Sequence, residues 1–282
     1  MKEGRHIVST EWLADHLNDP AVAILDASWH MPDSGRNGRD EFDKSHIPGA
    51  RHFDIDKVAE QDCDLPHMLP SAAEFSRHAR KLGLTNHNMI VIYDTGGVRA
   101  AARAWWMFRT FSHDRVRILD GGMERWLREG RPTTHEATTI QQGHFTALRQ
   151  PHHRATKEDV LNAIETGSAQ IIDARGIPRF RGDEDEPREG VRSGHMPSAK
   201  NLPYFRLFTD DGTFETASDV ARHFLDAGVD FEKPIITTCG SGVTACILAF
   251  CLNMIGKEDV RVYDGSWVEW GSDHTLPLAK GQ

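Results

Sequence analysis

The strongest constraint on the fold is an internal repeat of the sequence. Four landmarks of the first half recur in the second half, each about 145 residues further along the chain. Nearly constant spacing over four landmarks indicates a duplication, so we expect two domains of the same type. The paired landmarks are Ile24–Ser28 with Ile171–Arg175, His46–Ala50 with His195–Ala199, Met89–Asp94 with Pro234–Cys239, and Leu119–Trp126 with Tyr263–Trp270.

Each half alternates short β-branched runs with helical patterns, and this alternation predicts an α/β fold with a mainly parallel sheet flanked by helices. We expect an N-terminal domain over residues 5–131, a polar linker over 132–154 that lies on the surface of both domains, and a C-terminal domain over 155–280. In the second half the patterns predict strands at Gln170–Ile172, Pro234–Thr238 and Arg261–Tyr263, and helices at Lys157–Glu165, Ala217–Ala227 and Val243–Ile255, the last ending at Gly256.

Composition narrows the class of protein. The 282 residues are 39% hydrophobic and 27% charged, ordinary values for a soluble globular chain, and the net charge of −9 argues against a nucleic-acid partner. The longest apolar run, Ala245–Leu252, is too short to cross a membrane, and the N-terminus lacks a secretory pattern. Four cysteines suit a reducing compartment. We therefore expect a cytoplasmic protein with no membrane partner.

The segment Thr238–Ala245 carries the clearest chemical signal. Cys239 follows an apolar strand, and Gly240 and Gly242 allow a tight loop that leads into an apolar helix. Inward-facing N–H groups and the positive end of the helix stabilise a thiolate, so we expect Cys239 to be a nucleophile. The alternative is a buried cysteine beside a structural glycine turn. A cysteine phosphatase needs an arginine where this chain has Ala245, which argues against that activity.

These residues resemble the tandem-domain sulfurtransferases of the rhodanese superfamily. The loop Cys239–Thr244 reads Cys-Gly-Ser-Gly-Val-Thr, which is the signature of the 3-mercaptopyruvate sulfurtransferases within that superfamily. The resemblance implies two rhodanese-like domains, the first of them catalytically inactive, and Asp94 stands where the repeat would place the cysteine. The likeness runs from Val8 to about Pro277 and includes His46–Ala50, Ala104–Arg109 and Tyr263–Trp267.

The resemblance implies that sulfur passes from 3-mercaptopyruvate through a persulfide on Cys239 to a thiol, thioredoxin or cyanide, with release of pyruvate. No metal or organic cofactor is expected. The implied catalytic helpers are His46 and Ser241, because the family pattern places the His46 motif near the domain interface. The alternative role of His46 is structural, since His195 has the same place in the repeat. The outer sulfur would be held by the loop residues Gly240, Ser241, Gly242, Val243 and Thr244.

The resemblance also assigns the carboxylate and keto oxygens of the substrate to Arg179 and Arg188, whereas Arg181 is not required. Arginine suits this task because its planar fork of donors matches a carboxylate. The alternative is a solvated charged loop in which the acidic run Asp183–Glu186 pairs with the arginines.

Two other functions stay open. A thiosulfate sulfurtransferase would share the fold and the persulfide, and a non-catalytic persulfide carrier would accept sulfur from a partner enzyme. Cys246 and Cys251 lie on the predicted helix after the loop, where we expect buried packing and no redox role.

Overall fold

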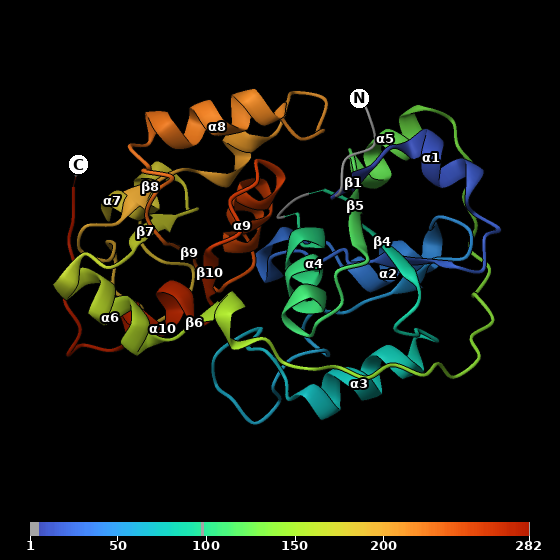
Figure 1. Ribbon diagram of the computed structural model, residues 1–282, viewed down its shortest axis with the longest axis horizontal. Coiled ribbons are helices and arrows are strands. Elements are labelled where there is room, and N and C mark those ends of the chain that lie inside the picture. Colours follow the sequence, from blue (N-terminus) through green and yellow to red (C-terminus); the bar gives the residue numbers. More distant parts are fainter. Residues whose placement is uncertain (1–5, 97–98, 282) are drawn as a thin grey trace. The chain divides into compact units, whose positions relative to one another are not determined.

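The structure of the protein is a computed structural model that describes residues 6–96 and 99–281. The described chain divides into two compact units, each built on its own five-stranded sheet (Figure 1). The N-terminal unit contains the described residues up to 61 together with 69–150 and 209–214. The C-terminal unit contains residues 62–68, 151–208 and those from 215 onward.

The sheet of the N-terminal unit has the strand order β1-β5-β4-β2-β3, and its paired strands are parallel. The strands are β1 (Ile7–Val8), β2 (Val22–Asp26), β3 (Arg51–His52), β4 (Met89–Tyr93) and β5 (Val116–Leu119). The helices are α1 (Thr10–Asp15), α2 (Gly38–Lys44), α3 (Ala72–Lys81), α4 (Ala101–Thr110) and α5 (Gly122–Arg128), with a 3₁₀ turn η1 (Pro32–Ser34).

The sheet of the C-terminal unit repeats that order as β6-β10-β9-β7-β8, again with parallel pairing. The strands are β6 (Arg154–Ala155), β7 (Gln170–Asp173), β8 (Lys200–Asn201), β9 (Ile235–Thr238) and β10 (Val260–Tyr263). The helices are α6 (Lys157–Thr166), α7 (Ile177–Arg181), α8 (Ala217–Asp226), α9 (Ala245–Met254) and α10 (Ser266–Ser272), with 3₁₀ turns η2 (Pro151–His153) and η3 (Tyr204–Leu207).

The two identical strand orders confirm the predicted duplication and the α/β fold. The predicted strands and helices of the second half are found within one or two residues of their expected bounds. Helix α9 begins at Ala245 instead of Val243, because Val243 and Thr244 still belong to the loop that follows β9. Gly256 follows that helix with φ +88°, as expected for a helix end.

Each sheet is covered by helices on both faces, which is what its near-continuous apolar strands require. In the N-terminal unit, α1, α2 and α5 contribute Leu13, Phe42 and Trp126 to one apolar core. On the same unit Phe75 of α3 stacks on Phe111, at the end of α4, with ring centroids 4.3 Å apart. In the C-terminal unit α8 packs against α9, and α9 packs against β9 and β10 (Figure 1).

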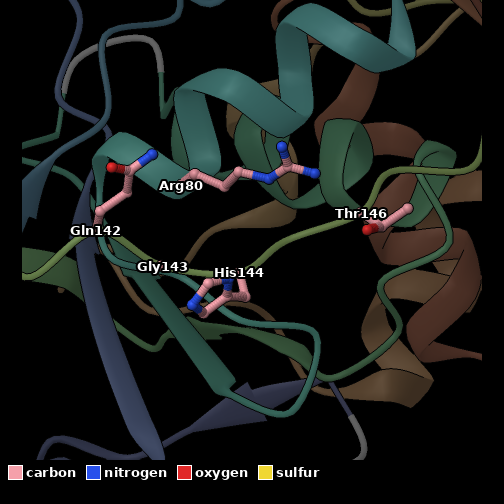
Figure 2. Close-up of a pocket in the computed structure, with 5 residues that line it drawn as sticks. All are labelled: Arg80, Gln142, Gly143, His144 and Thr146. Carbon is pink, nitrogen blue, oxygen red and sulfur yellow. The ribbon is translucent and has the colours of Figure 1, made fainter.

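The expected linker has no regular strand or helix over residues 132–150 and belongs to the N-terminal unit. It is held there by hydrogen bonds, including one from Gly143 N–H to the carbonyl oxygen of Arg80 (2.9 Å) and one from Arg80 Nε to that of Phe145 (2.7 Å). Figure 2 shows this stretch of the linker beside the side chain of Arg80. The domain boundaries expected from the sequence stay a prediction.

Within residues 6–96 and 99–281, none of the helices is both long and apolar enough to cross a membrane.

Candidate active site

Cys239 directly follows strand β9, whose residues are all buried, and is itself 2% exposed. The β-branched run Ile235–Thr238 favours an extended strand, and the glycines after it allow the chain to turn at once. The loop is tied to helix α10 by two backbone bonds, because the carbonyl oxygens of Cys239 and Gly240 accept from the N–H groups of Trp267 and Val268, each at 2.9 Å. The position of the thiol is therefore fixed by two neighbouring elements.

The loop presents backbone donors that the protein itself does not use. In the described chain, the N–H groups of Gly240, Ser241, Val243 and Thr244 donate to no protein acceptor. Thr244 stands before α9 without a side-chain cap on the helix. Unused N–H groups at the start of a helix favour an anion. The loop can therefore accept a negatively charged sulfur beside Cys239.

Ser266 fixes the backbone of Cys239 from α10. Its hydroxyl oxygen accepts a hydrogen bond from the N–H of Cys239 (3.2 Å), while its own proton goes to the carbonyl oxygen of Tyr263 (2.8 Å). Ser266 has φ +51°, a left-handed conformation that a non-glycine residue rarely adopts. The equivalent residue of the first repeat is Gly122, with φ +54°. The second unit therefore keeps a side chain at a strained position, and that side chain contacts the cysteine.

Arg179 lies against the cysteine loop. A Cβ atom added to Gly240 would stand 3.0 Å from Nη2 of Arg179, so glycine leaves the room that the guanidinium occupies. The same Nη2 donates to Oε2 of Glu186 at 2.5 Å. The side chain of Arg179 is 27% exposed, so one side of this cation stays open to a ligand.

Glu186 is shared between two arginines. It also accepts from Nη1 of Arg175 (2.7 Å), and Arg175 in turn pairs with Asp173 at the end of β7 (2.7 Å). Burial alone would lower the pKa of Arg175, but Asp173 and Glu186 outweigh it and hold the pKa above its usual value. The buried side chains of Asp173, Arg175 and Glu186 therefore hold the partly exposed Arg179 in place.

The other two arginines of this stretch differ. Arg181 is exposed and pairs with Asp183 (3.2 Å), as the solvated-loop alternative expects. Arg188 is partly buried, and among the described residues its guanidinium has no hydrogen bond or ion pair. Arg188 is therefore available for an anionic ligand, whereas Arg181 is already neutralised.

The first unit has a carboxylate where the second has the thiol. Asp94 follows β4 as Cys239 follows β9, and its carbonyl oxygen accepts from Met123 N–H at 2.9 Å, the counterpart of the bond from Trp267. Its Oδ1 and Oδ2 accept from the N–H groups of Gly96 (3.2 Å) and Ala101 (2.9 Å). Burial raises the pKa of Asp94. This loop thus binds the side chain of its own Asp94. The inactivity of the first unit stays a prediction.

His46 is buried in the N-terminal unit. Its ring stacks on Phe42 with centroids 4.0 Å apart, Nδ1 lies 2.7 Å from the carbonyl oxygen of Phe42, and Nε2 lies 3.2 Å from that of Glu136. His195 stacks in the same way on Phe180, at 3.9 Å. A shared arrangement in both repeats favours the structural role. The catalytic role of His46 stays a prediction.

The remaining cysteines after the loop are packed inside the unit. Cys246 and Cys251 are fully buried, and burial raises the pKa of Cys251. Cys246 Sγ lies 3.2 Å from the carbonyl oxygen of Gly242. Both observations agree with the expected packing role. In the parts of the chain that the structure describes, no group of three or more His, Cys, Asp or Glu side chains is arranged to hold a metal ion.

Comparison with known proteins places this geometry in a family. The rhodanese-like domain model matches residues 9–129 and 156–273, one match for each repeat. The chain belongs to the rhodanese family. It is 41% identical over 288 residues to the 3-mercaptopyruvate sulfurtransferase of Rattus norvegicus, covering 99% of this chain and 97% of that one. It is also 41% identical over 293 residues to the thiosulfate/3-mercaptopyruvate sulfurtransferase 1 of Arabidopsis thaliana, covering 96% of this chain and 77% of that one.

The fold agrees with a solved rhodanese structure. SseA of Escherichia coli, described as a 3-mercaptopyruvate sulfotransferase, superposes with a TM-score of 0.85 at 38% identity over 93% of this chain and 98% of that chain. The family resemblance inferred from the sequence is thus confirmed.

Sequence reasoning missed two features of this rhodanese site. The acidic run that contains Glu186 was compatible with a solvated loop, whereas the structure buries the carboxylate of Glu186 between Arg175 and Arg179. Ser266 was also missed, although aligning the repeats sets it against Gly122 and so offers a signal. Arg179 and the loop from Cys239 to Thr244 are brought together as expected.

Proposed function

We propose that the protein is a 3-mercaptopyruvate sulfurtransferase. The observation that carries this proposal is a buried cysteine whose loop holds unused N–H donors and lies against Arg179. The names of relatives at about 40% identity support the same donor. The cation would bind the carboxylate of the donor while the loop N–H groups receive its sulfur.

The proposed reaction has two steps. The thiolate of Cys239 attacks the sulfur of 3-mercaptopyruvate, the carbon–sulfur bond breaks, and its electron pair leaves with the carbon as the enolate of pyruvate, which then takes up a proton. The outer sulfur of the new persulfide carries negative charge and accepts from the N–H groups of Gly240 to Thr244. The thiolate of a small thiol or of reduced thioredoxin, or cyanide, then attacks this outer sulfur and restores the Cys239 thiolate.

The substrate is oriented by two cations with different surroundings. Arg179 is fixed by Glu186 beside the loop, whereas Arg188 has no ion pair among the described residues and is able to move onto the substrate. Ser241 is 9% exposed within the loop, where its hydroxyl is able to donate to the enolate or the persulfide. We propose Ser241 as a catalytic residue and keep His46 as a proposed helper.

A pyruvate assay tests the function. Purified protein supplied with 3-mercaptopyruvate and excess thiol should release pyruvate over many turnovers, and Cys239→Ser should release none. A persulfide carrier, which accepts its sulfur from a partner enzyme, would not accumulate pyruvate in this assay. A thiosulfate sulfurtransferase would turn over thiosulfate at least as fast as the organic donor. The proposed compartment is the cytoplasm, which cell fractionation would test.

A further inference from the structure

The N-terminal unit contains a small pocket that is separate from the cysteine loop. It has a volume of about 170 Å³ and lies between α2, β3 and the linker. All of its lining residues belong to this one unit. The residues that line it are Arg39, Phe42, Asp43, His46, Ala50, Arg51, His52, Leu82, His135, Ala137, Thr138 and Ile140.

Arg51 is the unusual member of this lining. Within residues 6–96 and 99–281 its guanidinium has no ion pair or side-chain hydrogen bond, and its Nε atom is buried without a partner. Burial lowers the pKa of Arg51. A cation that is partly removed from water without an anion is unfavourable, so an absent anionic partner is the simplest account.

His52, the next residue of β3, also has a buried polar atom that lacks a hydrogen-bond partner in the described chain. Its Nε2 is buried and has no partner among the described residues. Its ring tilts against Phe42, with centroids 5.5 Å apart. Two neighbouring residues of one short strand therefore both leave polar atoms unused beside the same pocket.

The second repeat shows that the fold does not require buried polar atoms without partners on this strand. Lys200 and Asn201 hold the equivalent positions on β8. There Lys200 donates to Oε1 of Gln170 (2.7 Å) and to the carbonyl oxygen of Gly228, and Asn201 donates to the carbonyl oxygens of Asp173 (3.0 Å) and Arg175 (2.9 Å). The polar side chains of this strand have hydrogen-bond partners in the C-terminal unit, whereas Arg51 and His52 leave buried polar atoms without partners in the described part of the N-terminal unit. The difference therefore comes from the side chains and not from the fold.

The walls of the pocket indicate the chemistry of its occupant. Among the lining residues the acid is Asp43, and it is already paired with Arg39 at 2.8 Å. The excess charge therefore comes from Arg51. Apolar side chains such as Leu82 and Ile140 form the rest of the wall. Apolar walls with one unpaired arginine suit a small molecule with a carboxylate head and a short apolar tail.

We propose that this pocket binds a small organic carboxylate, with the carboxylate on Arg51 and the tail against Leu82 and Ile140. The pocket of Figure 2, on the next stretch of the linker, does not offer an arginine whose buried Nε lacks a partner. There Arg80 already donates from Nε to Phe145, and the side chains of Gln142, His144 and Thr146 are exposed to water. The proposal does not depend on the sulfurtransferase activity.

Butyrate serves as the probe and butyramide as its neutral analogue of the same shape. Amide shifts of the full-length, isotope-labelled protein would be followed by transverse-relaxation-optimised NMR. Butyrate should shift the amides of Ala50, Leu82 and Thr138 in a saturable way, and butyramide should not. Arg51→Gln should weaken this binding by about tenfold to a hundredfold, the effect of losing a charge-assisted contact. Arg51→Lys should recover part of it.

The matched control is Arg222→Gln, which removes an exposed arginine paired with Asp219 in the C-terminal unit and should leave the binding unchanged. If Arg51→Gln fails to fold, its spectrum shows this, and the comparison of butyrate with butyramide on the wild type decides alone. Equal shifts from both probes would overturn the proposal. So would butyrate shifts confined to the loop from Cys239 to Thr244.

Discussion

The hydroxyl oxygen of Ser266 accepts the backbone N–H of Cys239 at 3.2 Å, from a residue whose φ is +51°. In the first repeat, Gly122 takes this conformation and Asp94 replaces the cysteine. The unit with the thiol therefore retains a strained side chain that the other unit lacks. Strain at such a place commonly accompanies a positioning role.

Ser266→Ala should slow persulfide formation on Cys239 while leaving the fold intact. It removes the neutral hydrogen bond that holds the N–H of Cys239, worth about 0.5–1.5 kcal/mol or roughly two- to tenfold in rate. The bond to the carbonyl oxygen of Tyr263 is lost with it. Ser266→Gly should slow it by a similar factor, although glycine relieves the backbone strain and should unfold at a higher temperature than the alanine variant. Stopped-flow measurement of sulfur uptake checks this, and wild-type rates in both variants would contradict a positioning role.

Arg179→Ala and Arg188→Ala should weaken the donor step and leave persulfide discharge nearly unchanged. Losing a charge-assisted contact to a carboxylate costs about 1.5–3 kcal/mol, or tenfold to a hundredfold in kcat/KM. Arg181→Ala is the matched control, because that arginine is exposed and paired with Asp183. The two half-reactions are measured separately. Equal losses in both, or an equal loss in the control, would show that these arginines support structure instead.

Gly240→Ala should raise the KM for the donor by a few-fold to about tenfold, since its Cβ would press on Nη2 of Arg179 at 3.0 Å and loosen the pair with Glu186. Gly176→Ala is the control: it lies before α7 with φ −58°, and its nearest neighbour would be 4.0 Å away. Steady-state kinetics with both variants decide. An unchanged KM at position 240 would mean that Arg179 does not hold the donor.

The wild type should prefer 3-mercaptopyruvate to thiosulfate by at least about tenfold in kcat/KM. A unit charge about 4 Å from one of the two charges of thiosulfate contributes about 4 kcal/mol at an effective dielectric near 20, before desolvation is subtracted, and a third of this shifts selectivity about tenfold. The loop side chains from Gly240 to Thr244 carry no charge, so none of them supplies such a contact to the dianion. Ser241→Lys, which places a cation in the loop, should narrow the ratio. A wild type equally fast on both donors contradicts this account.

Glu41 should make stability depend on acid pH. Its hydrogen bonds with Arg36 lower the pKa of Glu41 from 4.5 to about 2. The stabilisation is present above pH 4.5 and is lost as the pH falls towards 2, with an upper limit of about 3 kcal/mol. Glu41→Gln should lower the melting temperature at pH 6 and have little effect at pH 2. The exposed pair of Asp43 with Arg39 is the control, worth under about 1 kcal/mol. Equal effects of Glu41→Gln at both pH values would contradict the shift.

Much of the fold follows from the sequence, because local patterns repeat. The run Ile235–Thr238 is a strand by its β-branched residues, and glycines punctuate the loop after it. The end of that loop does not follow from the sequence, since Val243 is apolar like the helix that it precedes and yet belongs to the loop. Which unit holds the linker depends on distant contacts, such as that of Gly143 with Arg80, which no local pattern contains.

The site was predictable where chemistry is concentrated in one segment, as at Cys239 to Thr244. Long-range partners were not. Glu186 belongs to an acidic run whose composition is typical of a solvated loop. Its carboxylate is buried because it pairs with Arg175, which lies two residues beyond the end of β7. Ser266 reaches Cys239 through the parallel pairing of β9 with β10, a contact across 27 positions of sequence. Such pairs require the tertiary structure.

The central claim is that Cys239 carries the transferred sulfur. Intact-mass spectrometry of the protein after brief exposure to 3-mercaptopyruvate, without any acceptor, tests it most directly. The account predicts the added mass of one sulfur atom in the wild type, its loss on adding a thiol, and no addition in Cys239→Ser. Cys246→Ser, which replaces a buried cysteine of the same unit, should still gain the sulfur. A sulfur adduct that persists in Cys239→Ser, or none in the wild type, would contradict the account.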